Sequence, residues 1–166
     1  MEAPPSIAKA FLLCLLCLFL YLISFSSAFI QCDLSDRKAL LQIAKDLSIT
    51  DWDPKTTPDC CNVWFGVGCD TNGRVTSLIH HLHGNGVEVP QRLPASLGGL
   101  PFLEALYIWG NLTGTIPDSI VNLFKLQNLH LSMGLSGRIP DFLSRLKRLT
   151  YLDLSPNSFT GSIPPT

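Results

Sequence analysis

The sequence predicts an α/β repeat solenoid, a short right-handed coil with a parallel concave sheet and a disulfide-pinned helical cap at its amino-terminal end. Two observations favour this fold. One pattern of proline and leucine occurs three times between residues 94 and 154, and a helical pattern with four cysteines precedes it. A unit that recurs at a fixed interval buries its apolar residues against its neighbours, so the units stack as a coil.

Residues 1–28 are predicted to be a signal peptide. Lys9 precedes an apolar run from 10 to 25, and the small residues Ser26, Ser27 and Ala28 follow where signal peptidase cleaves. A transmembrane anchor is the alternative, but the run is shorter than the roughly 20 apolar residues that a span requires. We therefore expect a secreted, extracellular or cell-wall protein that has no membrane span after removal of the leader.

Residues 29–73 are predicted to form an amino-terminal cap with four cysteines. Loss of the leader leaves Cys32, Cys60, Cys61 and Cys69, and an even number in an exported chain indicates two disulfides. One of the three possible pairings needs a strained bond between adjacent cysteines, and we favour Cys32–Cys60 with Cys61–Cys69. A zinc site is the competing hypothesis, but the spacing lacks paired C-x-x-C motifs.

A helix is expected within the cap, from Asp33 to Leu47, because apolar residues recur there on one helical face. Asp33 or Ser35 can accept hydrogen bonds from its first free amides, and Asp36 places a negative charge at the positive end of the helix dipole. A helix of this kind covers the apolar edge that the first repeat of a coil would otherwise expose. The predicted apolar face comprises Ala39, Leu40, Ile43, Ala44 and Leu47.

Residues 74–166 are predicted to form leucine-rich repeats, with the first distorted and the last incomplete. Pro94, Pro117 and Pro140 lie 23 residues apart, and Pro164 follows after 24. After each of the first three prolines, leucine or isoleucine recurs at every third position and the run ends in an L-x-L step, which is the pattern of leucine-rich repeats. Each coil is expected to continue through a small second strand and a 3₁₀ turn.

The distortion of the first repeat is visible in its length, since 28 residues separate Leu78 from Leu106. The same repeat places His80 where an inward aliphatic residue is expected. His80, His81 and His83 together suggest a metal site, but no further ligand with suitable spacing is evident. We therefore expect no metal and no other cofactor.

The concave face is the predicted binding surface, because side chains between the leucines of each L-x-L step point outward. Tyr, Trp and His on an exposed ladder suit recognition of a protein or a carbohydrate. The candidate partner-binding residues are Tyr107, Trp109, His130, Tyr151 and Asp153. Alternatively, Tyr107 and Trp109 only cover the sheet edge beside the distorted repeat. The full outward set is Ala105, Tyr107, Trp109, Asn128, His130, Ser132, Tyr151, Asp153 and Ser155.

Two asparagines have specific predicted roles. Asn157 falls where such repeats place an inward side chain that bonds the backbone amides of the loop, whereas Met133 and Gly134 supply no such group one repeat earlier. Asn111 is either another inward residue of this kind or the exposed acceptor of the sequon Asn-Leu-Thr. We favour glycosylation of Asn111, which fits a secreted protein.

Composition and motifs argue against several classes of function. The formal net charge is −1, so no global field attracts nucleic acid. No Ser-His-Asp order, acidic pair or glycine-rich phosphate loop stands out in the sequence, and we expect no catalytic residues and no enzyme. The basic residues Arg138, Arg145, Lys147 and Arg148 offer contacts to an acidic polysaccharide, although charges on exposed loops are usually only solvated.

The motifs also carry a family resemblance. The cap order of Cys32, Trp52, an Asp-Cys-Cys triplet at 59–61 and W-F-G-V-G-C-D at 64–70 resembles plant extracellular leucine-rich repeat proteins. The L-t/s-G-x-I-P signature occurs at 112–117 and 135–140, with a third copy at 159–164. The phrase P-D-F-L-S-R-L-K at 140–147 is most similar to polygalacturonase-inhibiting proteins. That resemblance implies a defence protein whose concave face binds a pathogen polygalacturonase and obstructs its substrate cleft.

Two departures keep other functions open. Gly66 stands where inhibitors of this family usually carry a further cysteine, and its surroundings resemble receptor kinase ectodomains. The sequence also ends inside a repeat, whereas complete inhibitors have more repeats and a closing cysteine cap. The alternatives are a truncated receptor-like ectodomain that recognises a peptide or a co-receptor, and a non-functional gene fragment.

Overall fold

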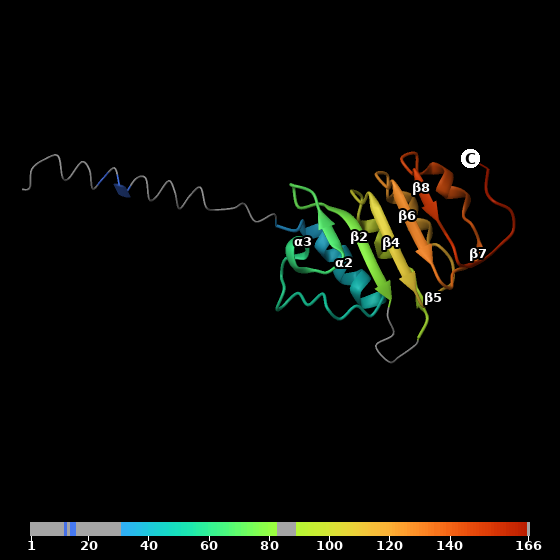
Figure 1. The fold of residues 1–166 in the computed structure, drawn as a ribbon, viewed down its shortest axis with the longest axis horizontal. Coiled ribbons are helices and arrows are strands. Elements are labelled where there is room, and N and C mark those ends of the chain that lie inside the picture. Colours follow the sequence, from blue (N-terminus) through green and yellow to red (C-terminus); the bar gives the residue numbers. More distant parts are fainter. Residues whose placement is uncertain (1–11, 13, 16–30, 83–88, 166) are drawn as a thin grey trace, which may run out of the picture.

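The computed structural model describes Leu12, Cys14, Leu15 and residues 31–82 and 89–165. Its main element is a five-stranded sheet with the order β1-β2-β4-β6-β8. Strand β1 runs antiparallel to β2, and the other strands are parallel to one another. Figure 1 shows these strands side by side, with the helical cap beside β1 and β2 and strand β8 at the opposite edge. The strands are β1 (Val67–Cys69), β2 (Val75–Leu82), β4 (Ala105–Gly110), β6 (Asn128–Ser132) and β8 (Tyr151–Asp153).

Each coil continues from its sheet strand through a second short strand and a 3₁₀ helix, as the repeat pattern predicts. Pro94, Pro117 and Pro140 each stand directly before a 3₁₀ helix in extended backbone, where no ladder donor is required. The second strands pair in parallel, β3 with β5 and β7 with β9. These elements are β3 (Gln91–Arg92), β5 (Leu112–Thr113), β7 (Ser136–Arg138), β9 (Ser158–Thr160), η1 (Ala95–Gly99), η2 (Asp118–Asn122) and η3 (Asp141–Arg145).

The register of the parallel strands is regular although the first repeat is longer than the others. Leu78, Leu106, Leu129 and Leu152 stand opposite one another on successive strands. The first of these intervals is longer than the next two, yet the pairing of these leucines stays in step. Residues 83–88 of this interval, including His83, lie outside the described residues.

The leucines fill a single apolar core along the coil. The inward positions are almost completely buried, and burial of each such side chain contributes about 1.5–3 kcal/mol relative to exposure. Because every coil contacts only its neighbours, this stabilisation accumulates by stacking. The fully buried large side chains include Leu97, Leu100, Leu103, Leu106, Ile108, Ile120, Leu123, Leu126 and Leu129.

The cap helix α2 (Leu34–Asp46) begins and ends close to the predicted bounds. Asp33 is its N-cap, and the Asp33 carboxylate accepts from the backbone amides of Ser35 and Asp36 at 2.9 and 3.2 Å. The helix buries Leu40, Ile43 and Ala44, and it packs against η1 of the first repeat. It therefore covers the amino-terminal end of the core, as the sequence predicted.

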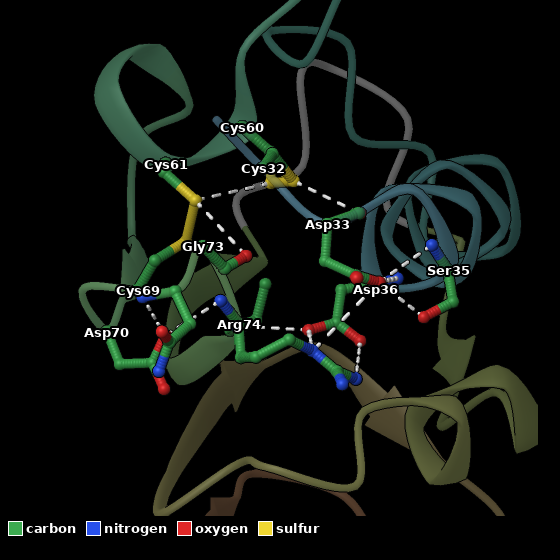
Figure 2. A network of polar contacts seen from close by, with 12 residues as sticks. Cys32, Asp33, Ser35, Asp36, Cys60, Cys61, Cys69, Asp70, Gly73 and Arg74 are labelled. Atoms are coloured by element: carbon green, nitrogen blue, oxygen red, sulfur yellow. Dashed lines mark hydrogen bonds and ion pairs between the residues drawn. A yellow bond between two sulfur atoms is a disulfide. The ribbon is translucent and has the colours of Figure 1, made fainter. Parts of the chain in front are cut away.

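Asp36 has a role that the helix dipole does not explain. Its carboxylate is completely buried and accepts from Arg74 Nε at 2.8 Å, Arg74 Nη2 at 2.6 Å and the backbone amide of Val75 at 2.9 Å. Figure 2 shows the guanidinium of Arg74 beside this carboxylate, near the two disulfides. The guanidinium also lies 4.0 Å from the centre of the Phe102 ring. The pair ties α2 to the start of β2.

Two disulfides join the cap in the favoured pairs, Cys32–Cys60 and Cys61–Cys69, each with a Cα–Cα distance of 5.5 Å. Cys60 and Cys61 open the short helix α3 (Cys60–Val63), so one turn of helix directs the adjacent sulfurs to two different partners. Beside it the rings of Trp52 and Trp64 stack with centroids 5.6 Å apart. The cap is therefore held by covalent bonds and by aromatic packing.

Candidate partner-binding face

The outward face of the five-stranded sheet, called the concave face below, presents its side chains in rows set by the strand register. One row runs across four strands through Ile79, Tyr107, His130 and Asp153, because these residues stand opposite one another. A second row contains His81, Trp109 and Ser132, and a third contains Ser77, Ala105, Asn128 and Tyr151. The predicted residues Tyr107, Trp109, His130, Tyr151 and Asp153 are therefore neighbours on one surface.

Aromatic rings from three successive strands stack on this face. The rings of His81 and Trp109 lie nearly parallel with centroids 5.2 Å apart, and those of Tyr107 and His130 lie 6.0 Å apart. Trp109 also meets His130 edge-on at 6.3 Å. Such stacked rings hold one another in place, and rigid amphipathic rings offer contact area at little entropic cost.

A polar network fixes the imidazole of His130. Its Nδ1 lies 3.1 Å from Asp153 Oδ2, and its Nε2 lies 3.1 Å from the hydroxyl of Ser132. The backbone amide and hydroxyl of Ser155 donate to Asp153 Oδ1 at 2.9 and 2.6 Å, and the Tyr151 hydroxyl donates to Oδ2 at 3.4 Å. These donors converge on one carboxylate, so Asp153 is the centre of the network.

The hydrogen bonds to Asp153 stabilise the ionised form of its carboxylate. The hydroxyl and amide of Ser155, with a smaller effect of His130, lower the pKa of Asp153 to about 2. The charge of Asp153 in turn raises the pKa of Tyr151, whose phenol therefore stays a neutral donor. The concave face thus carries a permanent carboxylate at the β8 end of its aromatic surface.

Ser132, His130 and Asp153 share the hydrogen-bond order of a hydrolytic triad, although no such order stands out in the sequence. Ser132 was expected to point outward, but it is only 4% exposed because His130 lies over it. Strand β6 pairs with β4 through Ser132, whereas its pairing with β8 ends at His130. In the described residues this arrangement orients the imidazole of His130 between Asp153 and Ser132.

Sequence reasoning missed two members of the face, Ile79 and His81 on β2. Ile79 is exposed, and His81 stacks on Trp109. The signal that identifies them is the alignment of Leu78 with Leu106, from which the outward residues of β2 follow in the same way as those of β4. The candidate surface therefore includes β2, one strand closer to the cap than the predicted residues.

The two metal hypotheses can be compared with the geometry of the described residues. His80 lies inward against Trp52, whereas His81 lies outward against Trp109, so adjacent residues of β2 present their imidazoles to opposite faces. The sulfurs of Cys32, Cys60 and Cys61 lie within 4.8 Å of one another, but each is bonded in a disulfide. Among the members that the structure describes, the two imidazoles face apart and the three sulfurs are already bonded.

The two asparagines differ in their surroundings. Asn157 Oδ1 accepts from the amides of Gly134 and Leu135, and its Nδ2 donates to the carbonyls of Leu131 and Leu154. The prediction of an inward, loop-bonding Asn157 is therefore confirmed. Asn111 is exposed, which is the orientation that glycosylation needs and not that of an inward ladder residue. Its glycosylation stays a prediction.

The backbone conformation of the cap explains why residue 66 is glycine. It adopts φ +79°, and a Cβ added there would lie 1.9 Å from the carbonyl oxygen of Ile79. The close approach of β1 to β2 therefore requires glycine, whatever function the cap serves. Within the described residues, no helix has the length and apolar character needed to cross a membrane.

Comparison with known families and proteins agrees with this architecture. The family described as leucine rich repeat N-terminal domain matches residues 33–70, and the leucine rich repeat family matches residues 148–166. Among solved structures, a plant ice-binding protein is 39% identical with a TM-score of 0.73 and covers 81% of this chain and 44% of its own. The leucine-rich repeat ectodomain of the Arabidopsis receptor kinase SOBIR1 is 29% identical with a TM-score of 0.63, covering 79% and 71%. The chain therefore has the fold of a leucine-rich repeat solenoid.

Curated relatives define its character further. Polygalacturonase inhibitor 2 of Phaseolus vulgaris is 43% identical over 103 residues, which cover 56% of this chain and 29% of the inhibitor. Polygalacturonase inhibitor 1 of Arabidopsis thaliana is 41% identical over 124 residues, covering 69% and 35%. The chain resembles the polygalacturonase inhibitors, and it spans about a third of the length of these two relatives.

Proposed function

We propose that the chain is a secreted binding protein whose concave face docks on a pathogen polygalacturonase and obstructs the access of pectin to that enzyme. The observation that carries this proposal is the aromatic and polar surface on β2, β4, β6 and β8. The 43% identity to polygalacturonase inhibitor 2 over 103 residues supports it. Interface energy is usually concentrated in buried aromatic anchors. Tyr107 and Trp109 are the anchors here, and His130, Tyr151 and Asp153 supply polar contacts.

The proposed organisation and location follow from the same features. Residues 1–28 act as a signal peptide, residues 29–73 form the cap and residues 74–166 form the repeats. Two disulfides in the cap favour an oxidising, extracellular compartment such as the cell wall. Pectin is a second, weaker partner that basic residues of the outer coil attract. Arg138 and Arg145 are two of these residues. Nucleic acid is not among the proposed partners.

The test of this function measures binding and inhibition separately. The full chain is expressed with secretion, and its affinity for a fungal polygalacturonase is measured by biolayer interferometry beside inhibition of pectin hydrolysis. Trp109→Ala and Tyr107→Ala should each weaken binding by at least about tenfold, the effect of a typical interface hot spot. Phe124→Ala is the matched control, because Phe124 is 67% exposed in the turn after η2 and lies off the concave face.

Binding without inhibition would still support recognition through this face and would limit the proposal to docking. Stable interfaces bury about 800 Å² on each partner, so a short coil can bind an enzyme without covering its whole cleft. Equal affinity of the wild-type chain, both aromatic variants and the control would contradict the assignment of the face.

A receptor ectodomain is the second candidate, favoured by the likeness to the SOBIR1 ectodomain and to PEPR1 in the PEPR1-AtPEP1 structure, which is 31% identical with a TM-score of 0.58. Sequencing the transcript downstream of the Thr166 codon separates the two. Further repeats with a closing cysteine cap favour the inhibitor, whereas a membrane span and a kinase favour the receptor. An immediate stop, together with an aggregating product, favours a non-functional fragment.

A further inference from the structure

We infer that a protein docking on the concave face drives the uptake of one proton by His130, so that binding tightens as the pH falls. The inference rests on the proposed function, because it needs a partner that covers this face. It concerns how the face is regulated, which the likeness to the inhibitors does not specify. The carboxylate of Asp153 and the imidazole that faces it are the groups that carry it.

The first step is the hydrogen-bond pattern of neutral His130. Asp153 is ionised and can only accept, so the His130 nitrogen that lies 3.1 Å from its carboxylate must hold the hydrogen. The other nitrogen, 3.1 Å from Ser132 Oγ, is then left as the acceptor of the serine hydroxyl. The network therefore selects one tautomer, with the proton on Nδ1 and the lone pair on Nε2.

The second step concerns the atom to which an added proton binds. The proton binds Nε2 of His130, which then donates to the oxygen of Ser132, and the serine hydroxyl hydrogen turns toward another acceptor. Both imidazole nitrogens are donors in this state, and the bond to Asp153 becomes an ion pair. No heavy atom has to move, because both partner oxygens are already within hydrogen-bond distance.

The third step is the effect of removing water. In the free protein the side chains of His130 and Asp153 are 23% and 29% exposed, so water still solvates the lone carboxylate. A docked partner displaces that water. Asp153 keeps its hydrogen bonds from Ser155 and Tyr151, but a buried carboxylate without a counter-charge costs more than a buried ion pair of zero net charge. Protonation of His130 converts the carboxylate into half of a neutral pair, so the complex holds the proton more tightly than the free protein does.

The surroundings of His130 leave Asp153 as the dominant influence. Tyr107 on β4 and Tyr151 on β8 present phenols to the imidazole, and Asp153 raises the pKa of Tyr151. Ser132 and Asn128 on β6 carry no charge. His81 on β2 is separated from His130 by Trp109, which contacts both rings. The only permanent charge facing the imidazole from the packed strands is therefore the negative one of Asp153.

The test is isothermal titration calorimetry of the secreted full chain with a fungal polygalacturonase, in buffers of different ionisation enthalpy. Between about pH 7.5 and pH 5.5, the range in which imidazoles titrate, the complex should take up a net proton and the affinity should rise several-fold. His130→Asn keeps a donor toward Asp153 but cannot take up the proton, so it should remove this component. Asp153→Asn removes the charge that requires neutralisation and should have the same effect.

His80→Leu is the control, since it removes the inward imidazole of β2, which lies against Trp52 and off the concave face, and leaves the pair of His130 and Asp153 intact. It should keep the proton uptake of the wild-type chain. Circular dichroism establishes that every variant is folded before titration. Proton uptake that is equal in the wild-type chain and in His130→Asn would overturn the inference while leaving the proposed function in place. Absence of binding at every pH would overturn both.

Discussion

The imidazole of His80 lies edge-on against the indole of Trp52, with ring centroids 5.7 Å apart, at an inward position that the repeat pattern assigns to an aliphatic residue. Its Nδ1 is buried without a hydrogen-bond partner. Burial lowers the pKa of His80, while Asp51 has a smaller opposing effect. The first repeat therefore carries a polar group that its core stabilises only in the neutral form.

Replacement of His80 by leucine should stabilise the protein by about 1 kcal/mol near neutral pH, since it removes an unsatisfied buried polar atom. The wild-type chain should lose stability as the pH falls below about 6.5, because the unfolded chain then binds a proton that folded His80 resists. Thermal melts at neutral and mildly acidic pH test both expectations. His81→Leu serves as the control, and a His80→Leu variant that melts earlier than wild type at neutral pH would contradict the prediction.

Replacement of Asp36 by asparagine should destabilise the cap by about 2–4 kcal/mol, because it leaves the Arg74 guanidinium without its buried counter-charge. Chemical denaturation of the oxidised protein measures this loss. Asp33→Asn is the control, since Asp33 lies 3.9 Å from Arg74 Nε but is partly exposed, and asparagine caps helices as well as aspartate does. Similar stability of the two variants would show that the Asp36 pair contributes little.

The comparison of Asp36 with the rest of the cap shows what a sequence can predict. The repeat period, the cap helix and the disulfide pairs follow from local patterns and spacing, and all three agree with the structure. Arg74 lies 38 residues from Asp36, and no periodicity links them, so the pair emerges only from the fold. The concave face was predicted only in part. The outward residues of β2 were missed because the longer interval from Leu78 to Leu106 hides the register of β2 with β4.

Replacement of Gly134 by alanine should destabilise the protein by about 3 kcal/mol or more, because the residue adopts φ +122° and its Cβ would lie 2.1 Å from the Leu112 carbonyl oxygen. Gly114→Ala is the matched control. Gly114 also has a positive φ, of +78°, but its nearest neighbour is Arg92 Cγ at 3.7 Å, so only the backbone strain of about 1 kcal/mol applies. Urea denaturation of both variants measures the difference, and equal losses would contradict the predicted clash.

Replacement of Asn157 by leucine should cost about 3–5 kcal/mol, since two amides and two carbonyls of adjacent coils lose their partner together. The loss should appear as faster hydrogen exchange at Gly134 and Leu135, the residues whose amides donate to Asn157. Unchanged exchange at these two amides would contradict the assignment of Asn157 as the bridge between the coils.

Replacement of Asn111 by glutamine should remove one N-linked glycan from the protein secreted by plant cells and leave its melting temperature nearly unchanged. Asn111 is exposed, so the side chain itself stabilises little. Mass spectrometry before and after glycosidase treatment measures the glycan. A wild-type protein without a glycan at this position would refute the modification.

In the loop around Met133, a backbone carbonyl makes the hydrogen bond between coils that the side chain of Asn157 makes one coil later. One coil before Asn157, the backbone carbonyl of Met133 itself accepts from the amide of Leu112 at 2.9 Å, and Met133 donates its own amide to Pro156 at 2.8 Å. This geometry depends on positive φ angles at Met133 and Gly134. Gly134 lies 23 residues before Asn157 and takes the equivalent position one coil earlier. At that position the connection between coils can therefore be made either by the side chain of asparagine or by a backbone that turns through glycine.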